Sequence, residues 1–155
     1  MWIEDKLYEQ IKSSVPIPCV DLVVGNTDGE LLLIKRVNEP AKGHWWFPGG
    51  RVRHGELRAD AAVRKLAEEC QLFASEIHEL GTFDVLLPLT WGGFSHAIST
   101  VYEVKIQREP EVCLDNQSVD FRWVRFAELA DLQLHPFLMK CLEASNSLPV
   151  RDPVP

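Results

Sequence analysis

The sequence predicts one domain of the α/β class. Segments with the two-residue periodicity of strands alternate along the chain with segments that have the 3.6-residue periodicity of helices. A length of 155 residues suits one domain with a substantial core, and 46% hydrophobic with 25% charged residues is typical of a globular protein. No repeat or linker divides the chain, so we expect residues 1–148 to form the domain and residues 149–155 a Pro-rich tail.

The first part of the chain predicts a helix followed by three strands. Residues 3–11 carry apolar side chains at helical spacing, which predicts a short amphipathic helix. Residues 17–24 have the pattern of an apolar strand, and the Asn-Thr-Asp-Gly turn at 26–29 leads as a hairpin into a second strand at 31–37. Residues 44–47 predict a short aromatic strand.

Two features of these strands are chemically informative. Asp21 interrupts the first apolar strand, where it is either a solvated edge residue or a carboxylate that points into a cleft. Of the adjacent Trp45 and Trp46, we expect one to be buried and the other to cover part of a cleft; base stacking is the less favoured alternative.

The middle of the chain predicts a central helix at residues 57–71. Its expected core face consists of Ala62, Val63, Leu66 and Cys70, and its expected polar face of Asp60, Arg64, Glu68 and Glu69. After it, the pattern predicts strands at 77–87, 96–106 and 120–124, a loop at 88–94, and helical segments at 126–132 and 136–144.

Composition and charge exclude several classes of protein. The net charge of −7 and pI near 5.2 give little support to sequence-independent nucleic-acid binding. No apolar run is long enough to span a bilayer and the N-terminus lacks a signal-peptide pattern, so a cytoplasmic location is expected. The sequence contains no Cys-x-x-Cys pair of the kind found in zinc or redox sites. We therefore expect reduced cysteines that serve only in packing at Cys19, Cys70, Cys113 and Cys141.

Residues 49–72 form the motif around which the rest of the chain is organised. The stretch begins with Gly49 and Gly50, crosses a polar turn, and enters the central helix, which ends near Glu68 and Glu69. Glycines allow the backbone to approach a ligand closely, and carboxylates supply the oxygen atoms that hard cations prefer. The motif therefore predicts a site for a bound phosphate and a divalent cation.

This motif resembles the Nudix box, G-x5-E-x7-R-E-U-x-E-E-x-G-U. The residues that fit in register are Gly50, Glu56, Arg64, Leu66, Glu68, Glu69 and Leu72. The resemblance implies an α/β/α sandwich with a mixed β-sheet between helices. It also implies hydrolysis of a nucleoside diphosphate linked to another moiety, normally with Mg²⁺. Two positions depart from the pattern, because Lys65 replaces a Glu and Gln71 replaces a Gly.

Lys65 changes what the box is expected to hold. Lys65, Glu68 and Glu69 are spaced i, i+3 and i+4 and share one face of the helix. A lysine there removes an oxygen ligand, changes the local charge by two units, and can pair with Glu69 in competition with a metal. We therefore expect a single Mg²⁺ on Glu69 with help from Glu68; the alternative is a simple exposed Lys–Glu helix pair.

A narrower resemblance, to GDP-mannose mannosyl hydrolases, covers most of the chain. It includes the N-terminal helix, Asp21, and segments 35–38, 40–43, 48–52 and 120–123. These hydrolases substitute at the sugar anomeric carbon and tolerate a degenerate box. The resemblance implies that Mg²⁺ is held by the Gly49 carbonyl, Glu69 and Gln117. It implies that Arg36 and Arg51 stabilise the departing diphosphate, and that Asp21 lies near the sugar. His96 matches a family histidine in position and is a substrate-binding candidate; the alternative is a structural histidine in a strand.

The general base is the missing part of this assignment. The subfamily has a basic His directly after the metal-binding Gln, whereas Gln117 is followed by Ser118. A serine cannot accept a proton near pH 7 without a base of its own. Asp115, Asn116 and Asp120 flank Gln117, and a carboxylate among them, Asp115 or Asp120, could serve as the base; His54 and His135 are further candidates.

Two functional hypotheses remain. The first is a Mg²⁺-dependent hydrolase of a nucleotide sugar or related nucleoside diphosphate derivative, attacked by water at carbon or phosphorus. The second is a Nudix-fold protein that binds a nucleotide or nucleotide sugar with little catalysis, which Lys65 and Ser118 favour. A purely structural domain ranks last. A homodimer through the N-terminal helix and the apolar loop at 86–91 is also expected.

Overall fold

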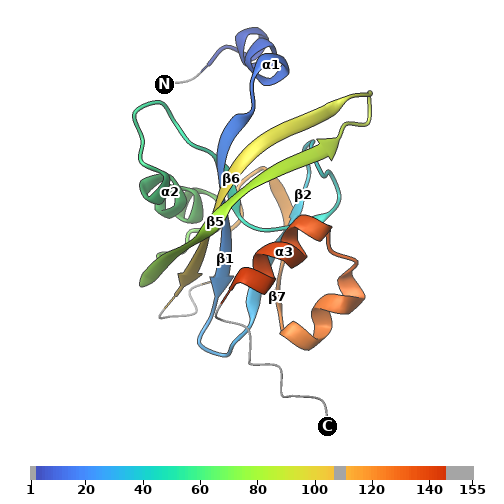
Figure 1. Cartoon of the computed structure of the whole chain (residues 1–155). Helices are drawn as coiled ribbons and strands as arrows, with labels where there is room; N and C mark the ends of the chain where they lie inside the picture. The colour runs from blue at the N-terminus through green and yellow to red at the C-terminus, as the bar shows by residue number, and fades with distance from the viewer. Residues whose placement is uncertain (1–2, 107–110, 146–155) are drawn as a thin grey trace.

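The computed structural model describes residues 3–106 and 111–145 of the chain, in which helices cover both faces of a mixed sheet (Figure 1). The helical elements are α1 (Asp5–Ser14), α2 (Arg58–Cys70), the 3₁₀ helix η1 (Phe126–Leu132) and α3 (Pro136–Ala144). The strands are β1 (Ile17–Gly25), β2 (Leu31–Arg36), β3 (Trp45–Trp46), β4 (Gly49–Arg51), β5 (Glu76–Pro88), β6 (Phe94–Lys105) and β7 (Ser118–Val124). The predicted α/β/α sandwich with a mixed sheet is confirmed, and the tail predicted at 149–155 lies outside the described residues.

The sheet has the order β3-β2-β1-β6-β5, with β4 pairing to β1 and β7 to β2. The parallel pair β1–β6 runs from Ile17 opposite Ala97 to Gly25 opposite Lys105, and β5 and β6 form a long antiparallel hairpin. The predicted hairpin at 26–29 is present only at its base, because β1 and β2 pair at Gly25 and Leu31 alone. Beyond that point β1 pairs with β4 and β2 with β3, so these two central strands diverge.

Two hydrophobic cores lie on the two faces of this sheet. Alternate residues of β1 divide between them: Leu22 packs with Leu66 of α2, and Val23 packs with Leu138 of α3. This division follows from the two-residue period of strands, which sends successive side chains to opposite faces. The continuous apolar run of β1 is therefore explained by helices on both sides of the sheet.

The face that α2 buries differs from the predicted one. Val63 is 43% exposed, while Lys65 and Glu69 are 6% and 4% exposed. The prediction that Val63 faces the core and Glu69 faces solvent is therefore wrong. The physical reason is that Lys65 and Glu69 lie one turn apart and pair with each other, which lets two ionic side chains occupy the buried face.

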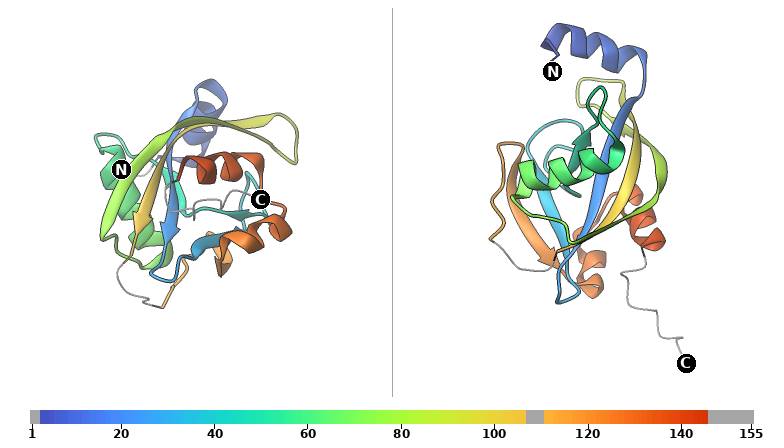
Figure 2. Two further views of the ribbon diagram at one scale, coloured as in Figure 1. Left: turned by 60° about the horizontal axis from the view of Figure 1, so that its bottom comes forward. Right: turned by 90° about the vertical axis from the view of Figure 1, so that its left-hand side faces the viewer.

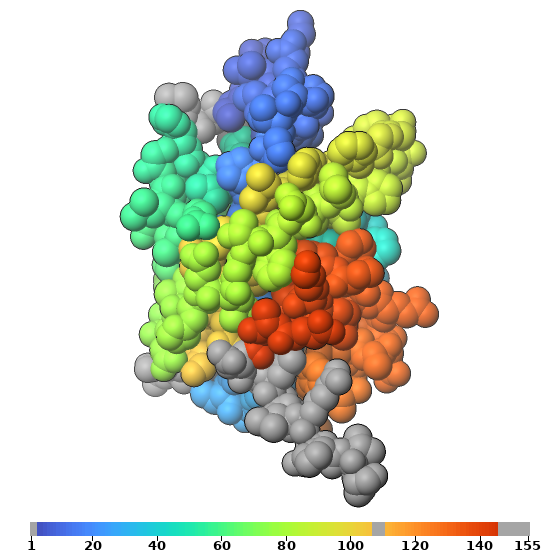
Figure 3. Space-filling view, in the orientation of Figure 1, coloured from blue at the N-terminus to red at the C-terminus, as the bar shows by residue number. Residues whose placement is uncertain are grey.

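Helix α1 stands apart from the body of the molecule (Figure 2), and none of its residues is buried. The space-filling view shows it as a lobe beyond one end of the sheet, with the tip of the β5–β6 hairpin projecting near it (Figure 3). Within residues 3–106 and 111–145, none of the helices combines the length and apolar character needed to cross a membrane.

Candidate active site

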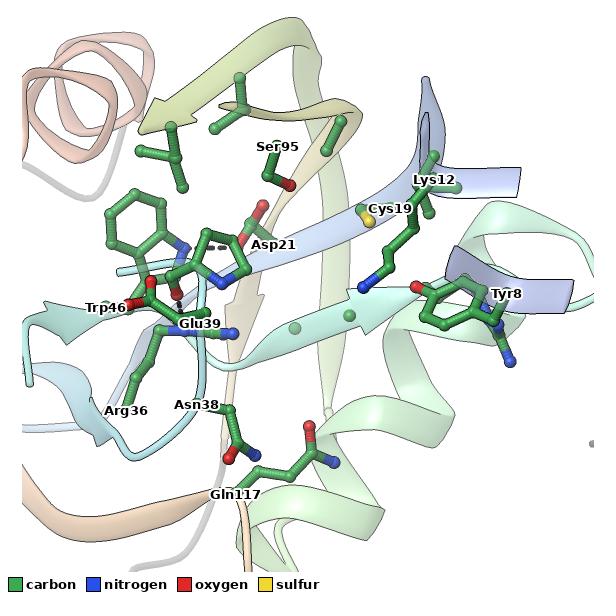
Figure 4. A pocket seen from close by; sticks show the side chains of 18 of the residues that line it. Tyr8, Lys12, Cys19, Asp21, Arg36, Asn38, Glu39, Trp46, Ser95 and Gln117 are labelled. Atoms are coloured by element: carbon green, nitrogen blue, oxygen red, sulfur yellow. Dashed lines mark hydrogen bonds between the residues drawn. The ribbon is translucent and has the colours of Figure 1, made fainter. Parts of the chain in front are cut away.

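A cleft lies between α1, the diverging strands β1 and β2, α2 and the tip of the β5–β6 hairpin (Figure 4). Its volume of about 650 Å³ falls in the range of small-molecule sites. Segments far apart in the sequence line it; among its polar and aromatic residues are Tyr8, Lys12, Asp21, Arg36, Glu39, Trp46, Arg51, Lys65, Glu68 and Gln117. The cleft can accept an anionic ligand with a polar and an aromatic part.

Two arginines supply positive charge to the cleft. Arg36, at the end of β2, donates from Nε to the Pro40 carbonyl at 2.9 Å. The Arg51 guanidinium lies over the Tyr8 ring of α1 at 4.6 Å from its centroid. Neither arginine forms an ion pair with a carboxylate in the described part of the chain. Unpaired guanidinium groups of this kind are suited to binding phosphate oxygens.

Asp21 is a buried carboxylate that the protein holds from both sides. The Trp46 indole N–H donates to its Oδ1 at 3.2 Å and the Ser99 hydroxyl donates to its Oδ2 at 2.5 Å. Burial raises the pKa of Asp21, and the two hydrogen bonds and the nearby Arg36 charge oppose that rise. Asp21 lies in a central strand and lines the cleft, so the alternative of a solvated edge residue is wrong.

The buried tryptophan is also the one that lines the cleft. Trp46 is 5% exposed, packs against His135 and Phe137, and reaches the cleft beside Asp21. Trp45, on the other face of β3, lies instead beneath the cations of Lys35 and Arg122. The expectation that one tryptophan is buried is confirmed. The same residue, Trp46, also lines the cleft, which was the role expected of the other tryptophan.

The polar turn of the motif is clamped to α2 by charged hydrogen bonds. Arg64 donates to both oxygens of Glu56, from Nε at 2.6 Å and from a terminal nitrogen at 2.7 Å, and also to the Arg51 carbonyl. These bonds lower the pKa of Glu56 from 4.5 to about 2. The clamp holds the Arg51 backbone against the helix, so its function is to position the cleft.

Lys65 occupies the centre of the predicted metal site. Its ammonium lies 2.5 Å from Glu69 Oε1 and 3.9 Å from a Glu68 oxygen. The other Glu69 oxygen accepts the Gly49 N–H at 3.0 Å. Burial raises the pKa of Glu69, against the lowering effect of Lys65 and of the Gly49 N–H. Lys65 lines the cleft whereas Glu69 does not, so the ammonium lies between that carboxylate and the ligand space.

The predicted metal ligands do not form a site open to a cation. Both Glu68 oxygens accept hydrogen bonds from arginines, Arg53 and Arg64, at 3.0 Å. The Gln117 side-chain amide donates to Asp115, and Glu69 Oε2 accepts the Gly49 N–H. In residues 3–106 and 111–145, no group of three His, Cys, Asp or Glu side chains is placed to hold a metal. The residues as arranged do not fit the implied Mg²⁺.

His96 is not part of the cleft. Its neighbours Ser95 and Ala97 line the cleft, so strand alternation directs His96 to the opposite face of β6. There its Nε2 lies 3.5 Å from Asp84 without forming a hydrogen bond. The assignment of His96 to substrate binding is corrected by this placement.

The residues predicted as general-base candidates also lie outside the cleft lining. Asp115 accepts hydrogen bonds from Gln117, Asp120 accepts its neighbour's backbone N–H, and His135 packs on Trp46. Ser118 is buried opposite Arg36 in the β2–β7 ladder. Glu39, which the sequence reasoning missed, is a partly buried carboxylate that lines the cleft and is a candidate general base. Only its position directly before the noted segment 40–43 could have indicated it.

Comparison with known proteins relates the chain to one family. A family model described as the NUDIX domain matches residues 15–144. The low-salt glycan biosynthesis protein Agl8 of Haloferax volcanii is 32% identical over 145 residues, which cover 92% of this chain and 90% of that protein. The ADP-ribose pyrophosphatase of Methanocaldococcus jannaschii is 40% identical over 68 residues, or 44% of this chain and 40% of that protein.

Solved structures share the fold. The NUDIX domain of Shewanella oneidensis NrtR, complexed with ADP ribose, superposes with a TM-score of 0.71 at 20% identity and covers 92% of this chain and 96% of its own. A MutT NUDIX hydrolase from Burkholderia pseudomallei gives a TM-score of 0.70 at 26% identity and covers 86% and 100%.

Proposed function

Because this chain belongs to the Nudix family of hydrolases, we propose that its substrate is a nucleotide sugar or a related nucleoside diphosphate derivative, with GDP-mannose-like hydrolysis as the first candidate. The observation that carries the proposal is the pair of arginines, Arg36 and Arg51, that line the cleft without carboxylate partners in the described residues. The likeness to a glycan biosynthesis protein over most of the chain supports a sugar as the second part of the substrate.

The proposed reaction assigns the cationic groups of the cleft to the diphosphate and a buried carboxylate to the sugar. Arg36 and Arg51 bind the diphosphate, where negative charge grows as the bond to the sugar breaks. Asp21, with Trp46 beside it, accepts a hydrogen bond from a sugar hydroxyl. Attack of water at the anomeric carbon forms a C–O bond and breaks the bond from that carbon to the phosphate oxygen. The products are the free sugar and the nucleoside diphosphate.

Glu39 is the proposed general base. It accepts a proton from the attacking water, which a carboxylate can do only if other groups leave its oxygen atoms free. Among the cleft carboxylates, Asp21 is held by two donors and Glu68 by two arginines. Two cleft carboxylates, Glu39 and Asp5, make no hydrogen bond or ion pair in the described residues. Asp5 is exposed on α1, whereas Glu39 is partly buried and lies on the side of Arg36 and Trp46 (Figure 4), so Glu39 is the one proposed.

Mg²⁺ is the cofactor that the sequence predicts, and Nudix hydrolases generally use divalent metals. Because Lys65 and the arginines already occupy the carboxylates of the box, no step of the proposed reaction depends on Mg²⁺. Each assay is therefore run both with Mg²⁺ and with a chelator.

The test is a hydrolysis screen over nucleoside diphosphate sugars, nucleoside triphosphates and dinucleotides. We expect turnover of a nucleoside diphosphate sugar, with at least a tenfold loss for Arg36→Met. In ¹⁸O-labelled water, label in the released sugar indicates attack at carbon, and label in the phosphate indicates attack at phosphorus. Turnover of triphosphates or dinucleotides alone would contradict the proposed substrate.

The second candidate function is a binding protein with little catalysis. The filled metal position and the buried Ser118 favour it. Calorimetry distinguishes it, because this candidate predicts nucleotide-sugar binding without turnover of any substrate in the screen.

A further inference from the structure

We propose that the Lys65 ammonium takes the place of the divalent cation in this site. It neutralises the carboxylates of α2 and presents a fixed positive charge to the ligand diphosphate, so the box binds no metal ion of its own. The part that concerns the diphosphate rests on the proposed function; the part that concerns the metal does not.

The ion pair on α2 is buried, unlike an ordinary helix pair. The side chains of Lys65 and Glu69 are 8% and 5% exposed, and their charged atoms lie 2.5 Å apart. Exposed pairs at this spacing contribute little to stability, and nothing requires their geometry to be fixed. A buried ammonium that still lines a cleft is held in one position by its partner, as a bound ion would be.

The formal charge of the site supports the replacement of a divalent cation by the Lys65 ammonium. Three carboxylates with one divalent cation carry a formal charge of −1, and so do two carboxylates with one ammonium. Replacement of the first of these three helix carboxylates by Lys65 therefore removes a ligand and supplies a cation in one step. The electrostatic environment offered to a bound diphosphate has the same net charge in both cases.

The surrounding backbone accommodates the lysine. Gly50 has φ +151°, and a Cβ at this position would lie 2.7 Å from Lys65 Cε and 3.2 Å from its Nζ. In the motif, a glycine at this position allows a ligand to approach the backbone closely. In this protein, Gly50 also leaves room for the Lys65 side chain. With the Gly49 N–H on Glu69 and two arginines on Glu68, the carboxylate oxygens around Lys65 already have donors.

Metal binding is tested without substrate by titrating Mn²⁺ into the protein and following the free-ion signal by electron paramagnetic resonance. We expect the wild type to leave the signal unchanged, and Lys65→Glu to bind Mn²⁺ at least tenfold more tightly. Binding of one Mn²⁺ by the wild type as tightly as by Lys65→Glu would overturn the proposal. Should Lys65→Glu fail to fold, tight stoichiometric binding to the wild type still overturns it, and absence of binding supports it.

The contact with the diphosphate is tested by calorimetry with GDP in the presence of a chelator. The double variant Lys65→Met/Glu69→Gln removes both charges of the buried pair, and we expect its Kd for GDP to rise at least tenfold. The matched control, Lys105→Met/Glu76→Gln, removes an exposed pair with a 3.0 Å contact that lies outside the cleft, and we expect no change.

The outcomes separate this inference from the proposed function. Wild-type affinity for GDP in the double variant would show that Lys65 only neutralises Glu69, which overturns the diphosphate contact. If the wild type binds neither GDP nor a nucleotide sugar, the proposed function fails and the diphosphate contact fails with it. The Mn²⁺ titration would still decide whether Lys65 replaces the metal.

Discussion

At the scale of single residues, the cleft is defined by how each charged side chain is paired. Asp21, Glu68 and Glu69 have their oxygens held by donors from the protein, whereas Arg36 and Arg51 have no carboxylate partner in the described residues. Groups held by the protein position their neighbours, and unpaired charges are free to bind a ligand. The chemistry of this cleft therefore depends first on the two arginines.

Substitution of either cleft arginine should weaken nucleotide binding. Loss of a hydrogen bond to a charged group costs ~1.5–3 kcal/mol, so Arg51→Met should raise the Kd for GDP by about 10- to 100-fold. Calorimetry measures the change. Arg122→Met is the matched control, because Arg122 lies over Trp45 outside the cleft and should leave the Kd unchanged. Equal effects of the two substitutions would contradict the assignment.

Replacement of Glu39 by Gln should separate binding from chemistry. The amide keeps the size of the side chain but cannot accept a proton, so kcat should fall by about 10²- to 10⁴-fold with little change in the Kd for GDP. Steady-state kinetics and calorimetry are the measurements. Glu9→Gln is the control, because Glu9 also lines the cleft but its carboxylate is paired with Lys12 at 2.6 Å. An unchanged kcat for Glu39→Gln would remove Glu39 from the mechanism.

At the scale of elements, α2 and the turn before it act as one unit. The bidentate Glu56–Arg64 contact joins the turn to the helix, and Arg64 also holds the Arg51 carbonyl. Helix α2 in turn presents Lys65 to the cleft. Packing of Leu66 and Ala62 in the core fixes this helix against the sheet, so burial of its apolar face determines where its charged face lies.

The Glu56–Arg64 clamp should make stability depend on pH. The folded-state pKa of Glu56 is about 2, below its ordinary value of 4.5, so its contribution is present above pH 4.5 and is lost as the pH falls toward 2. Urea denaturation should show Glu56→Gln to be ~1–3 kcal/mol less stable at pH 7, with a difference that shrinks toward pH 2.

A control distinguishes this partly buried clamp from an exposed ion pair. Glu76→Gln removes the partner of Lys105 at the surface and should leave the free energy of unfolding at pH 7 unchanged. If Glu56→Gln is as stable as the wild type at pH 7, the clamp contributes nothing to folding.

At the scale of the whole molecule, α1 and the tip of the β5–β6 hairpin project from the same end of the protein (Figure 3). Exposed large apolar side chains on these two elements are Leu7, Leu86, Trp91, Phe94 and Ile98, exposed by 41–69%. Apolar side chains that gather on a surface commonly mark a protein interface. We expect a second copy of the chain to bind there, so the homodimer stays a prediction.

Sedimentation velocity tests the dimer. The wild type should show concentration-dependent association between about 1 and 100 μM, and Leu86→Ser should shift it toward monomer. Val63→Ser is the control, since Val63 is 43% exposed on α2 rather than on the hairpin. A wild type that stays monomeric over the whole range would contradict the prediction.

The sequence by itself determined the family, the α/β class and most of the element positions. Strand and helix periodicities are local, and the fixed spacing of the box residues from Gly50 to Leu72 needs no long-range information. Helix α3 was predicted at its observed residues, and β1 within one residue of its end. Arg36, Arg51 and Asp21 all line the cleft, and their roles in binding and catalysis stay predictions.

Only the tertiary structure decided which of these residues are buried, paired or free. The sequence shows Lys65 beside two carboxylates, but burial by β4 and α2 makes it a fixed cation rather than a surface residue. Strand pairing directs His96 away from the cleft, and chain folding brings Glu39 and Tyr8 into it. The physical reason is that solvent exposure and charge pairing depend on neighbours distant in sequence, which a local pattern does not encode.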